Sequence, residues 1–205
     1  MKKKLKIGVL ASTRGTDLQA IIDAINSGKL NAEIACVISN KAEAFVLERA
    51  RNHNIEAIFI DVKGKNRDEY DKEVSKELDK RGIELICLIG YMRIVSDWFV
   101  KKYCSRIINV HPSLLPAFAG GMDKDVHTEV LKAGLKETGC TIHFVTEQVD
   151  GGPIIIQKKV PVLANDTPDS LKERVQAAEK VAYVEAIKLF SENKLKVSGS
   201  KVLIK

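Results

Sequence analysis

The sequence predicts an α/β fold, in which a mainly parallel sheet is flanked by helices and an antiparallel pair of strands is added near the C-terminus. Short apolar runs alternate with stretches of helical periodicity from the N-terminus onward, which is the pattern of βαβ units. Two later strand-like runs flank the tight turn 150–153, Asp-Gly-Gly-Pro, and strands joined in this way are antiparallel. The chain has 205 residues, enough to bury the core of such a fold.

The first half alternates regularly between strands and helices. Leu5–Ala11 is a continuous apolar run, typical of a buried strand, and Asp17–Ser27 carries apolar residues at helical spacing and stops at Gly28. The same patterns predict further elements of both types. The helices are Lys41–Asn52, Arg67–Lys80 and Val95–Tyr103, and the strands are Ala32–Ser39, Ala57–Ile60, Leu85–Ile89 and Arg106–Val110.

The second half changes character after a helix predicted at Asp123–Lys132. The antiparallel pair is Thr141–Val145 with Ile154–Pro161, and a long helix follows at Asp166–Glu192. Short apolar pieces in the tail predict a peripheral hairpin around Gly199. Since no linker or repeat interrupts the pattern, we expect a single domain over residues 1–205, of which about 190–205 form a peripheral tail.

The composition disfavours several classes of protein. Aromatic residues make up only 5% of the chain, which argues against a base-stacking surface for nucleic acid. The four cysteines show no C-x-x-C spacing, and three lie in apolar runs, so we expect neither disulfides nor a metal site. No apolar run approaches a membrane span, and the charged start leads into a strand rather than a signal peptide. We expect a cytoplasmic protein whose net charge of +6 suits small anionic substrates.

The segment 108–116, INVHPSLLP, is the strongest sign of chemistry. Asn109 and His111 are two residues apart, so on a strand their side chains share a face. Pro112 keeps His111 out of a helix, which places an amide and an imidazole at the carboxyl edge of the sheet, where open α/β sheets bind ligands. These groups suit the stabilisation of an oxyanion and the movement of a proton. A histidine before proline is also a common turn residue, and that alternative stays open for His111 alone.

Asp150 favours the catalytic interpretation, because its turn can bring a carboxylate to His111. Such a carboxylate would raise the pKa of the imidazole and favour imidazolium near neutrality. The alternative is that Asp150 serves only the turn, since Asp-Gly is a common turn pair. The other histidines are weaker candidates, and we expect His53 and His127 on the surface and His143 in the interior of a strand.

The motif GTDLQAI follows the first strand and opens the first helix. Thr16 and Gln19 match a capping box, and Gly15 lets the backbone approach a ligand. The backbone N–H groups of such a helix start favour an anion, and Arg14 adds a cation. A capped helix without a ligand explains the motif equally well, and a single glycine does not make a dinucleotide-binding fingerprint. Asp17 favours the helix dipole but repels a phosphate.

Two further segments are weak candidates by themselves. The stretch GYMRI (90–94) follows a buried strand, and Met92 beside Arg93 could line a pocket for a flat anionic ligand. Core packing with a solvated Arg93 is the alternative. Glu179 lies on the more polar side of the long helix, where a surface position is as natural as a functional one.

Taken together, INVHPSLLP, VDGGPI (149–154) and GTDLQAI resemble the glycinamide ribonucleotide formyltransferase family of purine synthesis, from about Leu5 to Leu189. INVHPSLLP is shared with the wider folate-dependent formyltransferases, whereas the chain length, the first-helix motif and RVQAAE (174–179) favour the ribonucleotide branch. The resemblance implies a Rossmann-like mixed sheet flanked by helices, 10-formyltetrahydrofolate as the formyl donor, glycinamide ribonucleotide as the acceptor, and no metal.

The resemblance also implies roles for individual residues. The catalytic residues would be Asn109, His111 and Asp150; those holding the ribonucleotide would be Gly15, Thr16, Asp17 and Glu179; and those holding the folate would be Arg67, Met92, Arg93 and Ile94. Asp17 stands where the family usually has Asn, so we expect Arg14 or backbone groups to hold the phosphate. Asn109 and a protonated His111 would stabilise the oxyanion, while Asp150 keeps His111 charged and helps relay a proton.

The sequence leaves other functions open. The acceptor could instead be an amino sugar nucleotide or methionyl-tRNA, or it could be water, as in a formyltetrahydrofolate hydrolase. We expect the last two enzymes to need an extra domain, for which this chain leaves no room. A catalytically silent ligand-binding module is a fourth possibility, although binding alone needs no acid–base pair. The expected partners are small molecules, and the residues do not specify an oligomeric state.

Overall fold

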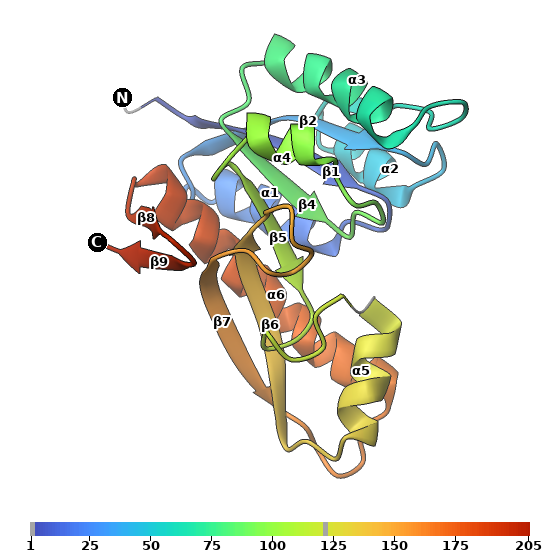
Figure 1. The fold of residues 1–205 in the computed structure, drawn as a ribbon, viewed down its shortest axis with the longest axis vertical. Coiled ribbons are helices and arrows are strands. Elements are labelled where there is room, and N and C mark those ends of the chain that lie inside the picture. Colours follow the sequence, from blue (N-terminus) through green and yellow to red (C-terminus); the bar gives the residue numbers. More distant parts are fainter. Residues whose placement is uncertain (1–2, 121–122) are drawn as a thin grey trace. The chain divides into compact units, whose positions relative to one another are not determined.

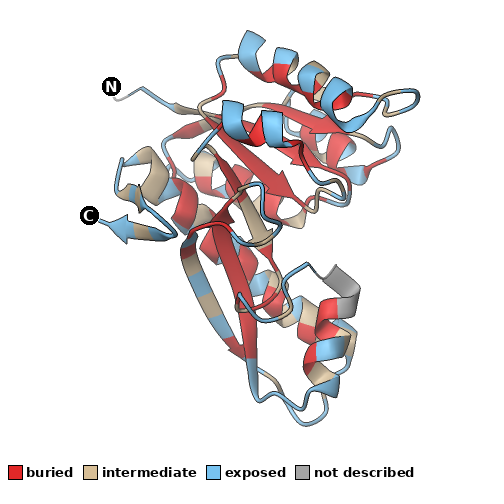
Figure 2. Cartoon of the chain, viewed as in Figure 1, coloured by how far each residue is buried: buried red, intermediate tan, exposed pale blue. Residues whose placement is uncertain are grey.

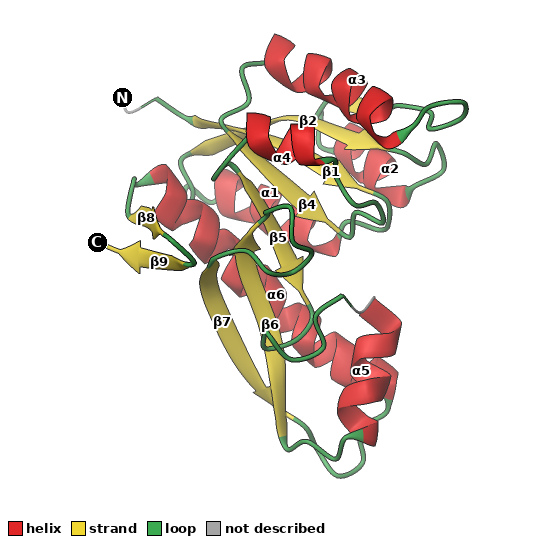
Figure 3. Ribbon diagram, in the orientation of Figure 1, coloured by secondary structure: helices red, strands yellow, loops and turns green. Residues whose placement is uncertain are grey.

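The computed structural model describes residues 3–120 and 123–205, and the side chains of 123–125 lie outside the described part. The chain divides into two compact units, one ending at Asn109 and the other beginning at Val110. Figure 3 shows the helices and strands, which alternate along the first half of the chain, as the sequence predicts. Among the described residues, none of the helices combines the length and the hydrophobicity needed to cross a bilayer.

The first unit is built around parallel strands in the order β3-β2-β1-β4-β5 (Figure 1). The strands are β1 (Leu5–Ala11), β2 (Ala32–Ser39), β3 (Ala57–Phe59), β4 (Leu85–Ile89) and β5 (Ile107–His111), the last of which continues into the second unit. The helices between them are α1 (Thr16–Asn26), α2 (Phe45–Asn52), α3 (Arg67–Lys80) and α4 (Asp97–Lys102). Every residue of β4 is buried, which is typical of a central parallel strand (Figure 2).

The second unit contains two antiparallel pairs and two helices. The strands β6 (Glu137–Phe144) and β7 (Ile154–Pro161) form one pair, and β8 (Leu195–Ser198) and β9 (Lys201–Ile204) form the other. The helices are α5 (Asp123–Lys132) and α6 (Pro168–Ser191). Residues on one face of α6 are buried, whereas β7 alternates between buried and exposed positions. β9 also lies beside β7, where Ile154 pairs with Lys201.

The predicted fold class is confirmed: the sheet is mixed and mostly parallel, helices flank it, and antiparallel strands are added toward the C-terminus. The expected hairpin around Gly199 is confirmed as β8 and β9. Two predicted boundaries are wrong by four residues. The second helix begins at Phe45 rather than at Lys41, because Lys41 accepts a turn hydrogen bond from the backbone of Ala44.

The strand predicted to begin at Thr141 instead begins at Glu137. Gly139 suggests a strand break in the sequence, but it lies inside β6, where a Cβ would come within 1.9 Å of the Lys158 carbonyl oxygen. The two backbones approach so closely that no larger residue fits, and glycine in a strand often marks such a contact. Gly139 therefore belongs to the packing of the pair.

Candidate active site

His111 is the last residue of β5, and Asn109 occupies the alternate position on the same strand. Ile107 and Ile108 are buried, and Asn109 pairs with Leu88 of the neighbouring strand. His111 itself is only 3% exposed. The prediction that Asn109 and His111 lie on one strand is therefore confirmed, and their alternate positions direct their side chains to one face of it.

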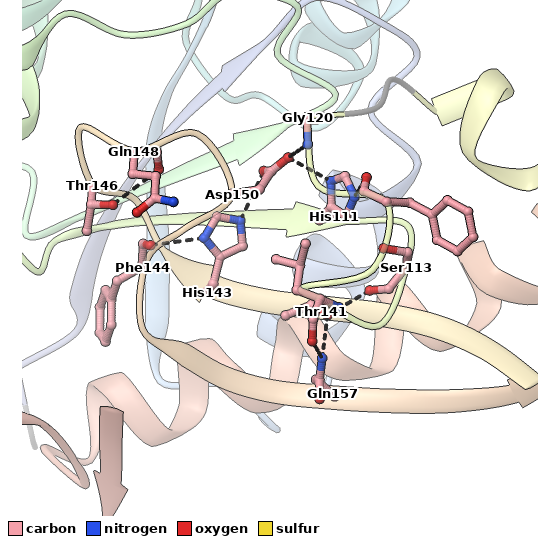
Figure 4. Close-up of polar contacts among 12 residues, drawn as sticks. His111, Ser113, Gly120, Thr141, His143, Phe144, Thr146, Gln148, Asp150 and Gln157 are labelled. Carbon is pink, nitrogen blue, oxygen red and sulfur yellow. Dashed lines mark hydrogen bonds and ion pairs between the residues drawn. The ribbon is translucent and has the colours of Figure 1, made fainter. Parts of the chain in front are cut away.

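The chain that leaves β5 is fixed by a network of polar side chains (Figure 4). The Thr141 hydroxyl donates to the Ser113 carbonyl at 2.6 Å and accepts from the backbone N–H of Leu115 at 3.0 Å. Gln157 Nε2 donates to the Leu115 carbonyl at 2.9 Å and to the Thr141 hydroxyl at 3.0 Å. Strands β6 and β7 therefore set the position of the segment that follows His111.

Asp150 faces His111, as the sequence predicts. Its Oδ2 lies 3.2 Å from His111 Nδ1 and accepts a hydrogen bond of 2.8 Å from the backbone N–H of Gly120 (Figure 4). The second carboxylate oxygen, Oδ1, lies 3.6 Å from Nε2 of His143. One carboxylate thus connects the segment after β5 with two imidazole rings.

The turn between β6 and β7 places this carboxylate. Asp150 has a φ of 52°, a left-handed conformation that Asp tolerates better than most residues. The N–H of Gly151 donates to the Gln148 carbonyl at 3.1 Å, which closes the turn. A Cβ on Gly152 would lie 1.7 Å from the carbonyl oxygen of Phe144, so only glycine fits at that position. The Asp-Gly-Gly sequence is therefore needed both for the turn and for the direction of the carboxylate.

His111 lies between two hydrogen-bond acceptors. Its Nδ1 faces Asp150, and its Nε2 lies 2.9 Å from the carbonyl oxygen of Phe118. Burial lowers the pKa of His111, and this effect outweighs the increase caused by Asp150 and by the Phe118 carbonyl. The prediction that the carboxylate favours imidazolium near neutrality is therefore wrong, because it left out the cost of charging a buried ring.

His143 is a site residue that the sequence analysis missed as a functional candidate. It lies inside β6, as predicted, but its ring points to Asp150, and its Nδ1 donates to the Phe144 carbonyl at 3.0 Å. His143 follows apolar and small residues in a buried strand, so the sequence pattern indicates only a core position and no functional role. The available signal is spacing, because His143 precedes Asp150 by seven residues across a single turn.

The pKa of Asp150 is held below its usual range. Burial alone would raise this pKa. The ring of His143, the N–H of Gly120 and the electrostatic effect of His111 together lower it by more than burial raises it. The carboxylate therefore remains ionised at neutral pH, beside an imidazole that is mostly neutral. A carboxylate in this position stabilises the imidazolium that forms when His111 takes up a proton.

In the first unit, α1 begins differently from the prediction. Gly15 is its N-cap, with a φ of 65°, and no side chain caps the helix, so the predicted Thr16–Gln19 capping box is wrong. The Gln19 side chain instead donates to Asp23 and accepts from Arg49. The backbone N–H groups of the first turn are left without a side-chain cap, which suits an anion. Asp17 is buried, at 4% exposure.

The loops at the carboxyl ends of β1, β2 and β4 meet at Ser12. Its hydroxyl donates to Asn40 Oδ1 at 2.6 Å and accepts from the backbone N–H of Met92 at 2.9 Å.

Of the residues expected to hold a folate, Met92 and Ile94 are exposed, and Arg67 is an exposed cation at the start of α3. The Arg93 guanidinium instead lies over the ring of Tyr70.

The expectation that His127 lies on the surface is wrong, because this residue is buried in α5. Glu179, for which the sequence leaves both a surface and a functional position open, is buried in α6. Cys36, Cys87 and Cys140 are buried thiols, as their positions in apolar runs predict. Within the described ranges, no cluster of three or more His, Cys, Asp or Glu side chains could hold a metal ion.

Comparisons with known proteins agree with this chemistry. A model of the formyl transferase family matches residues 5–187. The phosphoribosylglycinamide formyltransferase of Escherichia coli (strain K12) is 42% identical over 198 residues, which cover 94% of this chain and 90% of that protein. The trifunctional purine biosynthetic protein adenosine-3 of Gallus gallus is 45% identical over 195 residues, 95% of this chain but 19% of that protein, so the chain spans about a fifth of that relative's length.

A solved structure is similar to this chain over its whole length. The crystal structure of glycinamide ribonucleotide transformylase 1 from Symbiobacterium toebii matches with a TM-score of 0.95 and 43% sequence identity, and the match covers 100% of this chain and 95% of that chain.

Proposed function

This chain belongs to the formyl transferase family, and from that membership we infer how its buried histidine and the neighbouring carboxylate are used. The protein transfers the formyl group of 10-formyltetrahydrofolate to the amine of glycinamide ribonucleotide, a step of purine biosynthesis. The observation that carries the mechanism is the 3.2 Å contact between His111 Nδ1 and Asp150 Oδ2. It joins a group that can accept a proton to a group that stabilises the resulting charge.

The reaction does not need a strong base before the amine attacks, but it needs a group that takes up a proton during the attack. The acceptor amine resembles an α-amino group, with a pKa of about 8, so a minority is already neutral at pH 7. Burial lowers the pKa of His111, which keeps the resting ring neutral and ready to take up the proton that the amine loses as its nitrogen bonds to the formyl carbon. Asp150 then stabilises the imidazolium, and His111 returns the proton to the departing folate nitrogen as its bond to the carbon breaks.

The contact with Phe118 is compatible with this role. When the neutral ring donates from Nδ1 to Asp150, its Nε2 carries a lone pair that faces the Phe118 carbonyl at 2.9 Å. The hydrogen bond to the Phe118 carbonyl forms only when Nε2 carries a proton, so the neutral ring releases that carbonyl and leaves Nε2 free for an N–H of the amine. Nε2 is therefore the proposed site of proton uptake.

We assign the stabilisation of charge on the formyl oxygen to the Asn109 amide, joined by His111 once it is protonated. A donor in an oxyanion hole contributes about 2.7–4 kcal/mol, because it is already oriented in a site that excludes water. Asn109 lies two residues before His111 on β5, which is the support for this assignment.

Substrate contacts are proposed from the family resemblance. For the ribonucleotide they are Gly15, Thr16, Asp17 and Glu179, with the uncapped first turn of α1 and Arg14 for its phosphate. The buried position of Asp17 supports the view that the backbone, and not its carboxylate, meets the phosphate.

For the folate, the resemblance implies Arg67, Met92, Arg93 and Ile94, and we propose direct contacts for Arg67, Met92 and Ile94. The exposed side chains of Met92 and Ile94 suit a flat ring system, and the exposed Arg67 suits an anionic tail. The family uses this co-substrate and needs no metal. We propose small molecules as the partners and the cytoplasm as the location, since the buried free thiols suit a reducing compartment.

The test is turnover of the purified protein with 10-formyltetrahydrofolate and a panel of acceptors: glycinamide ribonucleotide, an amino sugar nucleotide and water. We expect formyl transfer to the ribonucleotide, and a fall in kcat of about 10²–10⁴-fold in His111→Ala and in Asp150→Asn. The matched control is His53→Ala, which removes an exposed imidazole and should leave kcat unchanged.

Circular dichroism establishes that each variant is folded. Turnover near that of the unmodified protein in folded His111→Ala or Asp150→Asn would remove the proposed roles. Transfer to another acceptor, with none to the ribonucleotide, would contradict the substrate.

A further inference from the structure

The loop that follows β4 is fixed at three points within the first unit. The backbone N–H of Met92 donates to Ser12 Oγ at 2.9 Å, near the start of the loop. The N–H of Ser96 donates to Asp71 Oδ2 at 2.6 Å, at its end. Between them, the Arg93 guanidinium carbon lies 4.4 Å from the centre of the Tyr70 ring. The loop is therefore held at both ends and in the middle.

Two of these three anchors belong to α3. Tyr70 and Asp71 are fully buried neighbours on that helix, and Ser96 is buried at the N-cap of α4. The N-terminus of α3 is itself fixed by a capping box between Asn66 and Glu69. Arg67 lies three residues before Tyr70, on the same side of the helix. One rigid helix thus carries both Arg67 and the groups that hold the loop.

The three central loop residues alternate in direction. Met92 and Ile94 are 40% and 55% exposed, whereas the Nε atom of Arg93 is buried and has no hydrogen-bond acceptor among the described residues. A guanidinium stacked on an aromatic face is held by the ring's electron density, which fits the position of Arg93 over Tyr70. The cation points inward, and two apolar side chains are displayed outward.

We propose that Tyr70 and Asp71 are positioning residues for the formyl donor, and that Arg93 acts as an anchor of the loop instead of a ligand of the donor. In this arrangement Met92 and Ile94 supply the contact surface for the donor's ring system, and α3 fixes the distance from that surface to Arg67. The inference rests on the proposed function, because it takes this loop and Arg67 to be the folate site.

A double-mutant cycle separates an anchor from a ligand. Tyr70→Leu and Arg93→Met should each raise the KM for 10-formyltetrahydrofolate by about ten-fold, with kcat and the KM for the ribonucleotide unchanged. If Arg93 acts through Tyr70, the double variant should be no worse than either single variant. Tyr70→Phe keeps the ring and should restore the KM of the unmodified protein.

The second anchor has its own pair of variants. Asp71→Ala removes the acceptor for the Ser96 N–H and should also raise the KM for the donor. Asp71→Asn keeps an oxygen at that position, so its KM for the donor should equal that of the unmodified protein. The matched control is Leu78→Ala, which loosens the packing of α3 at a buried position two turns away. It should lower the melting temperature without raising the KM for the donor.

The binding of tetrahydrofolate, measured by calorimetry, is a readout that does not depend on turnover. Weaker binding in Tyr70→Leu and Arg93→Met, without additivity, supports the proposal. Additive losses of affinity would show that Arg93 contacts the donor directly. An unchanged KM in folded Tyr70→Leu would remove the role of Tyr70. Either result overturns the proposal. Absence of transfer to the ribonucleotide by the unmodified protein, with tetrahydrofolate still bound, would instead contradict the proposed function.

Discussion

Asp150 is the residue on which the candidate site depends. Its carboxylate accepts from the Gly120 N–H and faces the rings of His111 and His143. Burial would raise the pKa of an isolated carboxyl at this position, yet these neighbours hold it below the usual range. Asp150 therefore stays charged at a half-buried position, and a charge of this kind is stable only while its partners remain.

The first prediction at this scale concerns His143. His143→Phe keeps the ring volume but removes the group that lowers the pKa of Asp150, so that pKa should rise. His143 also lowers the pKa of His111, so the acid limb of the profile of kcat/KM against pH, along which His111 becomes protonated, should move to higher pH, and kcat at pH 7 should fall by about ten-fold or less. His127→Phe, which removes another buried imidazole of the same unit, is the control. An acid limb that does not move would exclude His143 from this role.

Single residues were predictable where the signal is local. INVHPSLLP and the Asp-Gly-Gly turn are contiguous, and they identify the His111–Asp150 pair, which the structure brings to 3.2 Å. The direction of the His111 pKa was not predictable, because it depends on how completely folding removes water from the ring. The inward position of Arg93 was hidden as well, since its partner Tyr70 lies 23 residues earlier in the chain.

At the scale of elements, the β6–β7 turn does more than join two strands. The N–H of Phe144 donates to the Pro153 carbonyl at 2.9 Å across the base of the turn, and the Phe144 carbonyl accepts from His143 Nδ1. The backbone of Gly152 passes close to this same carbonyl. The turn, the ring of His143 and the carboxylate of Asp150 are therefore mechanically connected.

The prediction for this element is that Gly152→Ala disturbs both stability and catalysis. The added Cβ would lie 1.7 Å from the Phe144 oxygen, so the turn must shift and move Asp150 with it. We expect a loss of more than about 2 kcal/mol in the free energy of unfolding, measured with urea, together with a large fall in kcat.

Gly199→Ala is the matched control for that substitution. It introduces strain at a φ of 58° but meets no atom within 4 Å, so it should cost about 1 kcal/mol and leave kcat unchanged. Equal effects of the two substitutions would show that the Gly152 contact has no special role.

The types of the elements were predictable, and several of their ends were not. Continuous apolar runs and helical spacing identify each strand and helix of the first unit. The start of α2 depends on a turn hydrogen bond between Ala44 and Lys41, and the start of β6 depends on Gly139 lying against the backbone of Lys158. The first is a local turn and the second is a contact between two strands, and periodicity along the chain carries no signal for either.

At the scale of the whole molecule, buried titratable groups connect folding to pH. The pKa of His111 is lowered by burial, so the unfolded chain binds a proton more readily as the pH falls below about 6.5, and stability is lost from there downward. The pKa of Asp150 is also lowered, so its contribution is present above the unfolded value of 3.8 and is lost as the pH falls through the folded value. Both groups make the folded state less stable in acid.

The prediction is a melting temperature that declines in two stages. The first decline should begin below about pH 6.5 and belong to His111, and the second should begin below about pH 4 and belong to the carboxylates. His111→Asn should flatten the first stage and keep the second, as measured by differential scanning fluorimetry across this range. Parallel profiles for the variant and the unmodified protein would show that His111 does not contribute.

The hydrogen bond from Gly120 to Asp150 gives the molecule an intrinsic spectroscopic reporter. That amide donates to the same oxygen that faces His111, so its proton resonance in nuclear magnetic resonance spectra moves when the carboxylate gains or loses charge. Ionisation at the centre of the site is therefore visible from a backbone signal, without a substrate, a label or a change in the sequence.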